Sequence, residues 1–487
     1  MRHYLPVFAV LGGVLMIFSL AMLVPLAFAY FGRDAALAAY DGAILITFGS
    51  GALLFFGCRR RGTRRELQPR DGFLLVTLVW SVLPVFGALP LMFHLEGLSF
   101  TDAYFEAMSG LTTTGATVLT GLEKLPLSIN VWRCFMVLIG GMGILVLAVA
   151  ILPLLGVGGS QIFKAETPGP MKDEKLTPRI AETARGLWTV YFAIATACFL
   201  AYAAAGMGWA DAFMHMCSTM GLGGFAAYDA SYGHWNSPAI EGVAIIFMLL
   251  AGVNFALYFV AWKRGSLRGL LRDAEVRMYA LTMLLAVFGI AAFLALHGVY
   301  PTFTESLRHA AFNVVSIATT TGFASVDYAQ WPIFAPVLML FLCGFATCAG
   351  STGGGIKMAR ALLLLKQARR ELTRIVHPRA VAPVTLGGGV VDPKVLQSVL
   401  AFMLFYGGVM VVATLLLLVS GLDVISAFTA VVACINNTGP GLGEVGPANN
   451  FQGLTDFQTW VCSVTMLLGR LELFTVLVLL TPQFWRK

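Results

Sequence analysis

Charged residues are scarce in this chain of 487 residues: only 12% are Asp, Glu, Lys or Arg, whereas 58% are hydrophobic. An ordinary soluble domain carries about 25% charged residues. A chain this apolar cannot cover itself with a water-soluble surface, so most of it must be surrounded by membrane lipid. The composition therefore excludes a cytosolic enzyme, a disordered protein and, despite a net charge of +7, a protein that binds nucleic acid.

The sequence also lacks the cysteine and histidine patterns that hold metals or build disulfide frameworks. Its eight cysteines form no CxxC pair and lie mostly in apolar segments, and its seven histidines form no HExxH motif. Zinc sites and disulfide-rich folds need such spacings. We therefore expect buried thiols, no bound cofactor and no metalloenzyme.

Long uncharged segments recur along the chain, and about 20 residues suffice to cross a bilayer. The first segment is longer than the apolar core of a signal peptide, which is roughly 7–15 residues, so we interpret it as a retained helix. Ten segments predict ten membrane spans with both termini on one side: Leu5–Phe31, Gly42–Cys58, Gly72–Leu95, Cys134–Phe163, Gly186–Ala210, Gly242–Trp262, Met278–Thr304, Tyr328–Ile356, Val395–Leu422 and Phe457–Trp485.

The positions of the basic residues predict the orientation. Of the 32 Lys and Arg residues, 27 lie at the termini or in the alternate connections 59–70, 164–185, 263–277 and 357–394. By the positive-inside rule these connections and both termini are cytoplasmic. The connections on the other side carry an excess of acidic residues, and such a field attracts cations.

Four polar, glycine-bearing motifs recur on the predicted outer side, each after a semi-apolar stretch too short to cross the membrane. The first, Phe105–Gly115, and the third, Phe312–Gly322, both place Phe ten and Ser six residues before a glycine that ends a Thr-Thr-Thr-Gly run. In the second motif Gly221 and Gly224 compete for the equivalent position, and a serine six residues earlier favours Gly224. With Gly439 of the fourth motif, the glycines lie 109, 98 and 117 residues apart, which is typical of a repeated two-helix unit.

Loops of this kind at membrane depth suit the binding of a desolvated cation. Non-helical backbone survives there only when it is buried in protein or lines a water-filled path. Thr-Gly backbone then points carbonyl oxygens at the axis in place of a hydration shell, and the preceding short helices aim their negative C-terminal ends at the same place. We predict a selectivity filter made of Thr113, Thr114, Gly115, Leu222, Gly223, Gly224, Thr320, Thr321, Gly322, Asn437, Thr438 and Gly439.

Two alternatives accompany this interpretation. A single Thr-Gly cluster often marks only an ordinary turn or loop. Four clusters at equivalent positions favour a pore. Asp229, Asp327 and Glu444 each lie five residues past their glycine. They are either an acidic vestibule or ordinary solvated acids of the outer loops.

A glycine-rich stretch at 343–355 interrupts the eighth predicted span. It holds five glycines, and each costs roughly 0.5–1 kcal/mol in a helix interior relative to Ala, so the helix should break there. The stretch has the pattern of neither a P-loop nor a nucleophile elbow. We interpret it as an intramembrane loop below the filter that acts as a gate through Gly350, Gly353, Gly354 and Gly355; close packing of small residues between helices is the alternative.

Arg470 is the only basic residue deep within a predicted span. Such a charge is costly in hydrocarbon and normally faces the bundle interior or water. Glu472, two residues further on, faces away on a straight helix and cannot be a simple partner. We expect Arg470 beside the glycine-rich stretch, where it repels cations and donates to carbonyls left unpaired by the break; a salt bridge to another helix is the alternative.

The four motifs T-T-T-G-A, L-G-G-F, T-T-T-G-F and N-T-G-P, with the helices around them, resemble the Trk/Ktr/HKT superfamily of potassium transporters over essentially the whole chain. The extra N-terminal helix pair and the segments 70–73 and 180–185 resemble its TrkH branch. The resemblance implies a subunit of the bacterial inner membrane with K⁺ as the transported ion. It also implies a homodimer that is regulated by a cytosolic ring of TrkA-type subunits binding NAD or another nucleotide.

In that superfamily, glycine at all four filter positions goes with potassium, and serine at the first goes with sodium. The four filter glycines of this chain therefore fit potassium. The second and fourth motifs depart from Thr-Thr-Gly, so we expect a less symmetric filter than that of a tetrameric channel.

We therefore predict an all-α polytopic membrane protein with ten transmembrane helices and four repeats of helix, re-entrant pore loop and helix around one pore. The predicted units are an N-terminal helix pair at 1–69 and pore repeats at 70–163, 164–263, 264–376 and 377–487. We expect potassium uptake that is gated by the intramembrane loop and by a regulatory subunit docked on 357–394. The alternative is an ion-coupled secondary transporter, which predicts one or two broken helices rather than four matched loops. No Ser/His, His/Asp or paired-carboxylate set supports an intramembrane enzyme.

Overall fold

The computed structural model describes residues 4–61, 68–146, 176–387 and 389–486. These residues form a bundle of helices, and the only strands among them are β1 (Thr385–Leu386) and β2 (Gly389–Val390), which pair antiparallel. The predicted all-α fold is confirmed. The predicted end of the fourth span (147–163), the boundary at 163 and the basic stretches within 62–67 and 164–175 lie outside the described residues.

Helices of very different length make up the bundle. In chain order they are α1 (Leu5–Ala21), α2 (Leu23–Gly32), α3 (Leu37–Arg61), α4 (Pro69–Gly87), α5 (Leu89–His94), α6 (Phe100–Leu111), α7 (Leu127–Val146), α10 (Leu176–Ala204), α11 (Trp209–Gly221), α12 (Pro238–Ala251), α13 (Phe255–Arg264), α14 (Arg268–Arg272), α15 (Ala274–Leu296), α16 (Phe303–Ala318), α17 (Phe334–Phe345), α18 (Met358–Val376), α19 (Pro393–Val419), α20 (Val424–Asn436), α21 (Asp456–Arg470), α22 (Phe474–Leu477) and α23 (Pro482–Trp485). Short 3-10 turns lie at Leu122–Lys124, Ser231–His234, Tyr328–Gln330, Gly443–Val445 and Val478–Leu480.

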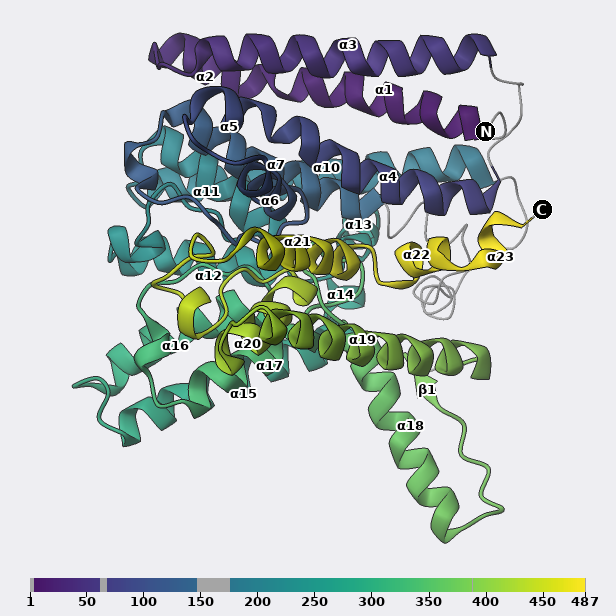
Figure 1. Ribbon diagram of the computed structural model, residues 1–487. Coiled ribbons are helices and arrows are strands. Elements are labelled where there is room, and N and C mark those ends of the chain that lie inside the picture. The colour runs from purple at the N-terminus through teal and green to yellow at the C-terminus, as the bar shows by residue number, and fades with distance from the viewer. Residues whose placement is uncertain (1–3, 62–67, 147–175, 388, 487) are drawn as a thin grey trace.

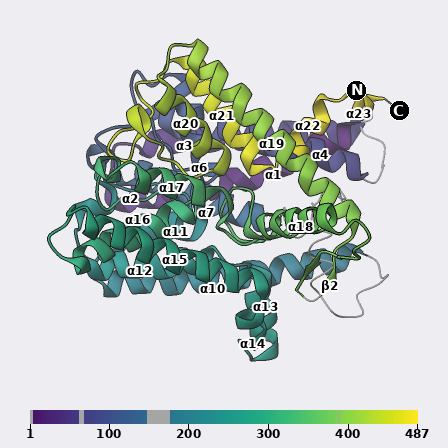
Figure 2. The ribbon, with the colours of Figure 1, turned by 90° about the horizontal axis from the view of Figure 1, so that it is seen from below.

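Seven helical stretches of the described residues are long and apolar enough to cross a membrane, and up to nine if two bent pairs each count as one span. The long helices run side by side, and the two chain ends lie at the same end of the bundle (Figures 1 and 2). The hairpin formed by α18, β1 and β2 projects downward from the bundle, crosswise to the long helices, in the half nearer the chain ends (Figure 1). The arrangement agrees with an even number of crossings.

The N-terminal pair packs through glycines. α1 and α3 lie against each other along most of their length (Figure 1). A Cβ atom added to Gly12 would lie 2.6 Å from the Gly51 carbonyl oxygen, and one added to Gly51 would lie 2.8 Å from the Gly12 carbonyl oxygen. Small residues thus let the two backbones approach closely, as they do between membrane helices in general.

Two predicted spans are sharply bent, which corrects the sequence prediction, and a third breaks at the glycine-rich stretch as the sequence predicts. The span predicted at 242–262 divides into α12 and α13, which meet at 87°, because the Asn254 side chain accepts the Ala256 N–H and starts a new helix. The span predicted at 457–485 bends by 105° after α21, where Glu472 and Leu473 have positive φ. The span predicted at 328–356 is α-helical only in α17, since the glycine-rich stretch follows.

Four short helices, α6, α11, α16 and α20, end inside the protein. Their C-terminal halves are buried all round: Ala103–Leu111, Met214–Gly221, Phe312–Ala318 and Thr429–Asn436. Each packs against longer helices, as α6 does against α4, α7 and α21. Because these ends are enclosed by protein, the loops that follow them are held at the centre of the bundle.

Candidate functional site

The four predicted filter loops meet at one place and interlock through their glycines. At each of the four glycines, the position of a missing Cβ atom is occupied by a carbonyl oxygen of the next loop. The pairs are Gly115 with Gly223, Gly224 with Thr321, Gly322 with Thr438, and Gly439 with Thr114. The loops therefore close a ring in the order first, second, third, fourth.

The backbone of the four loops repeats the same two unusual conformations. The filter glycines have φ of 81°, 57°, 90° and 96°, and the residues two positions earlier have φ between 53° and 61°. Those earlier residues are Thr113, Leu222, Thr320 and Asn437. Non-glycine residues with positive φ are uncommon, and β-branched ones are outliers. Such strain at four equivalent positions is typical of a functional site held by its surroundings.

One hydrogen bond sets the register of each loop on its short helix. The N–H before the filter glycine donates to the carbonyl six residues before that glycine. These bonds run from Thr114 to Ser109 (2.8 Å), Gly223 to Ser218 (3.0 Å), Thr321 to Ser316 (2.8 Å) and Thr438 to Ala433 (2.8 Å). Gly224 rather than Gly221 therefore occupies the equivalent place, and Gly221 packs against Val137 instead.

Threonine hydroxyls fix the first and third loops from behind. The Oγ1 atoms of Thr112 and Thr114 are 2.8 Å apart, and those of Thr319 and Thr321 are also 2.8 Å apart. The fourth loop has Asn437 in place of a threonine, and its Nδ2 donates to Thr114 Oγ1 of the neighbouring first loop at 3.0 Å. The ring is thus less symmetric than four identical loops would be.

A cavity with about 550 Å³ of empty space opens on one side of the ring. All four filter glycines line it, together with Asp229 and Arg133. The Asp229 carboxylate accepts the N–H groups of Gly121 (2.7 Å) and Leu122 (3.1 Å), which ties the second repeat to the first. Asp327 and Glu444, the other predicted vestibule acids, do not line this cavity.

The glycine-rich stretch forms a loop on the other side of the ring. Gly354 N–H donates to Thr320 Oγ1 at 2.9 Å, and a Cβ atom on Gly353 would lie 3.1 Å from the Thr319 carbonyl oxygen. A Cβ atom on Gly354 would collide with the carbonyl of Asn436, the last residue of α20. Only glycine allows this approach, so the loop lies directly against the predicted filter.

The same loop is bound to the bend in the second repeat. Gly350 carbonyl accepts the Phe255 N–H at 3.1 Å, and Cys348 N–H donates to the Gly252 carbonyl at 3.0 Å. Thr352 Oγ1 donates to the Met220 carbonyl at 3.0 Å. The helix break between α12 and α13 therefore supplies the backbone groups that hold the loop. Gly355 has φ of 81° and turns the chain back toward α17.

Arg470 lies beside this loop with a buried side chain. Its Nη1 donates to the Thr352 carbonyl (3.0 Å) and its Nη2 to the Gly140 carbonyl of α7 (3.1 Å). Among the described residues no carboxylate forms an ion pair with Arg470. The alternative of a salt bridge to another helix is therefore wrong for this part of the chain. Glu472 pairs with Arg360 of α18 instead.

Two residues of this region carried no signal in the sequence. Glu275, at the start of α15, accepts the N–H groups of Ala349 (2.7 Å) and Ala359 (2.9 Å) and so holds both sides of the loop. Lys357 is buried with φ of 79°, and its Nζ donates to the Gly353 carbonyl. Both lie within the predicted cytoplasmic connections 263–277 and 357–394, where acidic and basic residues are ordinary.

Comparisons with known proteins agree with this architecture. The family model TrkH, described as a cation transport protein, matches residues 38–487. The chain is 46% identical to the Trk system potassium uptake protein TrkH of Vibrio parahaemolyticus, over 98% of both chains, and 45% identical to that of Salmonella typhimurium, over the full length of both. The crystal structure of the potassium transporter TrkH from Vibrio parahaemolyticus superimposes with a TM-score of 0.92 at 43% identity and covers all of both chains.

Proposed function

Since the chain belongs to the TrkH family of cation transport proteins, which are transporters and not enzymes, we propose that it takes up potassium across the bacterial inner membrane through the ring of four loops. The observation that carries this proposal is the interlocked ring, in which each filter glycine receives a carbonyl of the next loop. Backbone carbonyls in such a ring replace the hydration shell of K⁺.

The twelve filter residues named from the sequence are the proposed potassium ligands and their supports. The four short helices end at the ring, so the negative ends of their dipoles favour a cation there. In our proposal the chain makes ten crossings, the eighth being α17 with the glycine-rich loop that follows it. The units are the N-terminal pair at 1–69 and four pore repeats at 70–163, 164–263, 264–376 and 377–487.

The proposed gate is the loop predicted at 343–355. It lies across the side of the ring opposite the outer cavity and bonds to the second, third and fourth repeats. Arg470 joins it to Gly140 of the first repeat. An intramembrane guanidinium in this place opposes the passage of cations. Opening then requires the loop to move aside together with α18, the helix that continues it.

Broken helices also occur in ion-coupled secondary transporters, where they surround a midplane substrate site. Here the two breaks bond to each other: the Gly252 carbonyl and the Phe255 N–H, at the break after α12, pair with backbone groups of the loop that follows α17. The free backbone groups that a substrate site needs are therefore engaged within the protein. This favours a gated pore over a substrate-binding transporter.

The hairpin of α18, β1 and β2 is the proposed docking surface for a cytosolic TrkA-type subunit that binds NAD or another nucleotide, in a complex with a homodimer of this chain. α18 carries Arg369, Arg370 and Arg374, and the hairpin also leaves Ile375 and Val381 exposed. A surface that combines basic and exposed apolar residues is typical of an interaction site.

Flux through the purified chain in liposomes tests the proposed function. We expect an inward K⁺ or Rb⁺ flux that saturates with the cation and exceeds the Na⁺ flux under the same gradient. A saturable flux of an organic solute without K⁺ conductance contradicts the proposal and favours a secondary transporter.

Cross-linking from the hairpin tests the docking surface. Val381 is 94% exposed at the hairpin, and Ala230 is exposed beside the outer cavity. In a Cys58→Ser background, Val381→Cys is expected to capture the regulatory subunit through a short bifunctional reagent, whereas Ala230→Cys captures none. Capture from Ala230 alone places the partner on the opposite face and refutes the proposal.

A further inference from the structure

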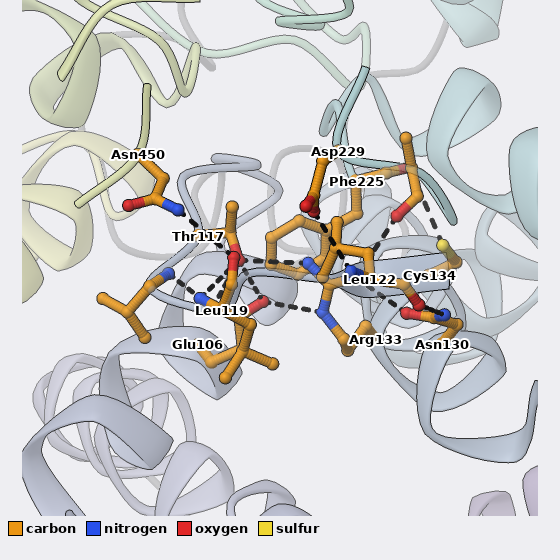
Figure 3. A network of polar contacts seen from close by, with 12 residues as sticks. Glu106, Thr117, Leu119, Leu122, Asn130, Arg133, Cys134, Phe225, Asp229 and Asn450 are labelled. Atoms are coloured by element: carbon orange, nitrogen blue, oxygen red, sulfur yellow. Dashed lines mark hydrogen bonds and ion pairs between the residues drawn. The ribbon is translucent and has the colours of Figure 1, made fainter. Parts of the chain in front are cut away.

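A buried ion pair lies behind the first filter loop, outside the residues that form the ring. Glu106 of α6 and Arg133 of α7 are both fully buried, and Glu106 Oε1 lies 2.7 Å from Arg133 Nε (Figure 3). Burying two charges requires a favourable geometry, because each loses its hydration. The pair is therefore retained against a cost, and the contacts around it indicate what it does.

Glu106 braces the backbone just beyond the first filter glycine. Its carboxylate accepts the Thr117 hydroxyl at 2.9 and 3.0 Å and the Val118 N–H at 3.0 Å (Figure 3). Val118 is the third residue after Gly115. A polar side chain on the preceding short helix thus fixes the stretch by which the loop leaves the ring.

The third and fourth loops have the same brace built from neutral side chains. Asn313 Oδ1 accepts the Ser325 N–H at 3.2 Å, and Thr429 Oγ1 accepts the Leu442 N–H at 2.9 Å. Ser325 and Leu442 are again the third residues after their filter glycines. These braces are neutral and stay within one repeat, whereas the brace of the first loop is charged.

The second loop is held differently. His215 occupies the place equivalent to Glu106, nine residues before its filter glycine, but its ring packs edge-on against Tyr232 and Trp235. Within the described part of the chain, no hydrogen bond joins the His215 side chain to the outgoing stretch of this loop. The second loop is also the one that departs furthest from Thr-Thr-Gly, since Leu222 and Gly223 replace its threonines.

Arg133 supplies the support that the second repeat lacks. Its Nη1 donates to the Ala226 carbonyl at 3.2 Å, two residues after Gly224, and its guanidinium lies 4.5 Å from the centre of the Phe225 ring. The neighbouring Cys134 Sγ lies 3.7 Å from the Phe225 carbonyl oxygen (Figure 3). The planar guanidinium of Arg133 donates at once to the Glu106 carboxylate, the Asn130 side-chain oxygen and the Ala226 carbonyl. A lysine ammonium cannot reproduce this geometry.

We propose that Glu106 and Arg133 are positioning residues for cation selectivity, which hold the second filter loop in place from the first repeat. The inference rests on the proposed function, because it assumes that the ring selects potassium. Glu106 has a second effect: Arg133 lines the outer cavity, and the carboxylate neutralises its charge, which otherwise repels entering cations.

The test compares flux and selectivity in proteoliposomes between the wild type and three variants. E106Q keeps the shape of the brace but leaves Arg133 unneutralised, so the K⁺ flux per folded protein should fall about tenfold. R133K keeps a charge but loses the fork, so the flux should stay within about threefold while the K⁺ to Na⁺ preference falls about tenfold. The double variant E106Q/R133M removes both charges and should recover flux and abundance, since no buried charge stays unpaired, without recovering the preference.

The pair between Arg308 and Glu241 provides a matched control. It is also an arginine–glutamate pair, joined by two hydrogen bonds of 2.7 and 2.8 Å, but it does not line the outer cavity. E241Q and R308K should leave the K⁺ to Na⁺ preference unchanged. Wild-type preference in both R133K and the double variant overturns the inference, whereas a wild-type protein without potassium preference overturns the proposed function itself. If E106Q does not fold, the double variant decides alone.

Discussion

Replacing Gly322 with Ser is expected to lower the preference for potassium over sodium at least about tenfold, which corresponds to about 1.4 kcal/mol. Gly322 has φ of +90°, and a Cβ atom there would collide with the Thr438 carbonyl oxygen and lie 2.9 Å from Pro440 Cδ. The Thr438 carbonyl is a proposed potassium ligand. Because the side chain forces that oxygen out of the ring, the number and spacing of ligands around the cation change.

The same substitution at Gly421 separates the collision from backbone strain. Gly421 has φ of +93°, close to that of Gly322, but nothing lies within 4 Å of its missing Cβ atom. Both variants should lose some abundance, since a left-handed backbone costs a non-glycine residue roughly 1–2 kcal/mol. Only Gly322→Ser should change selectivity.

The remaining filter glycines extend this test. A Cβ atom on Gly439 would lie 2.8 Å from the Thr114 carbonyl oxygen, whereas one on Gly115 would collide with the Gly223 carbonyl. We therefore expect a milder loss of preference for Gly439→Ser than for Gly115→Ser or Gly322→Ser. Reversal potentials in mixed K⁺ and Na⁺ measure the ratio. Wild-type ratios in folded Gly115→Ser and Gly322→Ser proteins mean that the filter lies elsewhere.

The register of the four predicted filter loops could be predicted from the sequence because it is local. The serine six residues before the glycine in the first three motifs marks the carbonyl that receives the N–H before the glycine. That bond belongs to the end of each short helix, so a spacing along the chain reports it. Ala433 holds the same place in the fourth loop, since the bond uses the backbone and needs no serine.

The bent helices and the gate contacts could not be placed in the same way. Hydropathy reads 242–262 as one uncharged span, although Gly252 and Asn254 end one helix and start the next within it. The backbone groups freed at that break bond to the loop at Cys348–Gly350, about a hundred residues later in the chain. Contacts between distant segments leave no periodic signal, and the partners of Glu106 and Glu275 were missed for the same reason.

Replacing Arg470 with Ala is expected to raise the K⁺ leak of proteoliposomes without the regulatory subunit, on the order of tenfold to a hundredfold. A fixed charge about 5 Å from a cation opposes it by about 3 kcal/mol at an effective dielectric constant of about 20. The substitution removes this barrier. It also removes the two donors that hold the Thr352 and Gly140 carbonyls, so the loop loses its connection to α7.

Two further variants separate the effect of the Arg470 charge from the effect of its two hydrogen bonds, which hold the loop. Arg470→Lys keeps the charge but cannot reach both carbonyls with one planar fork, so its leak should lie between those of the wild type and Arg470→Ala. Deletion within 350–355 removes the loop segment that contacts Thr320, Met220 and Phe255 and should leak as strongly as Arg470→Ala.

The comparison of leak with and without the regulatory subunit decides the gate assignment. In Arg470→Ala and in the deletion, the subunit should no longer raise the flux much, because the loop no longer closes the path. Both variants must first show wild-type abundance and insertion. If they then keep wild-type flux and wild-type dependence on the subunit, the loop is not the gate. Arg470 in that case only ties the loop to α7, by donating to the Thr352 and Gly140 carbonyls.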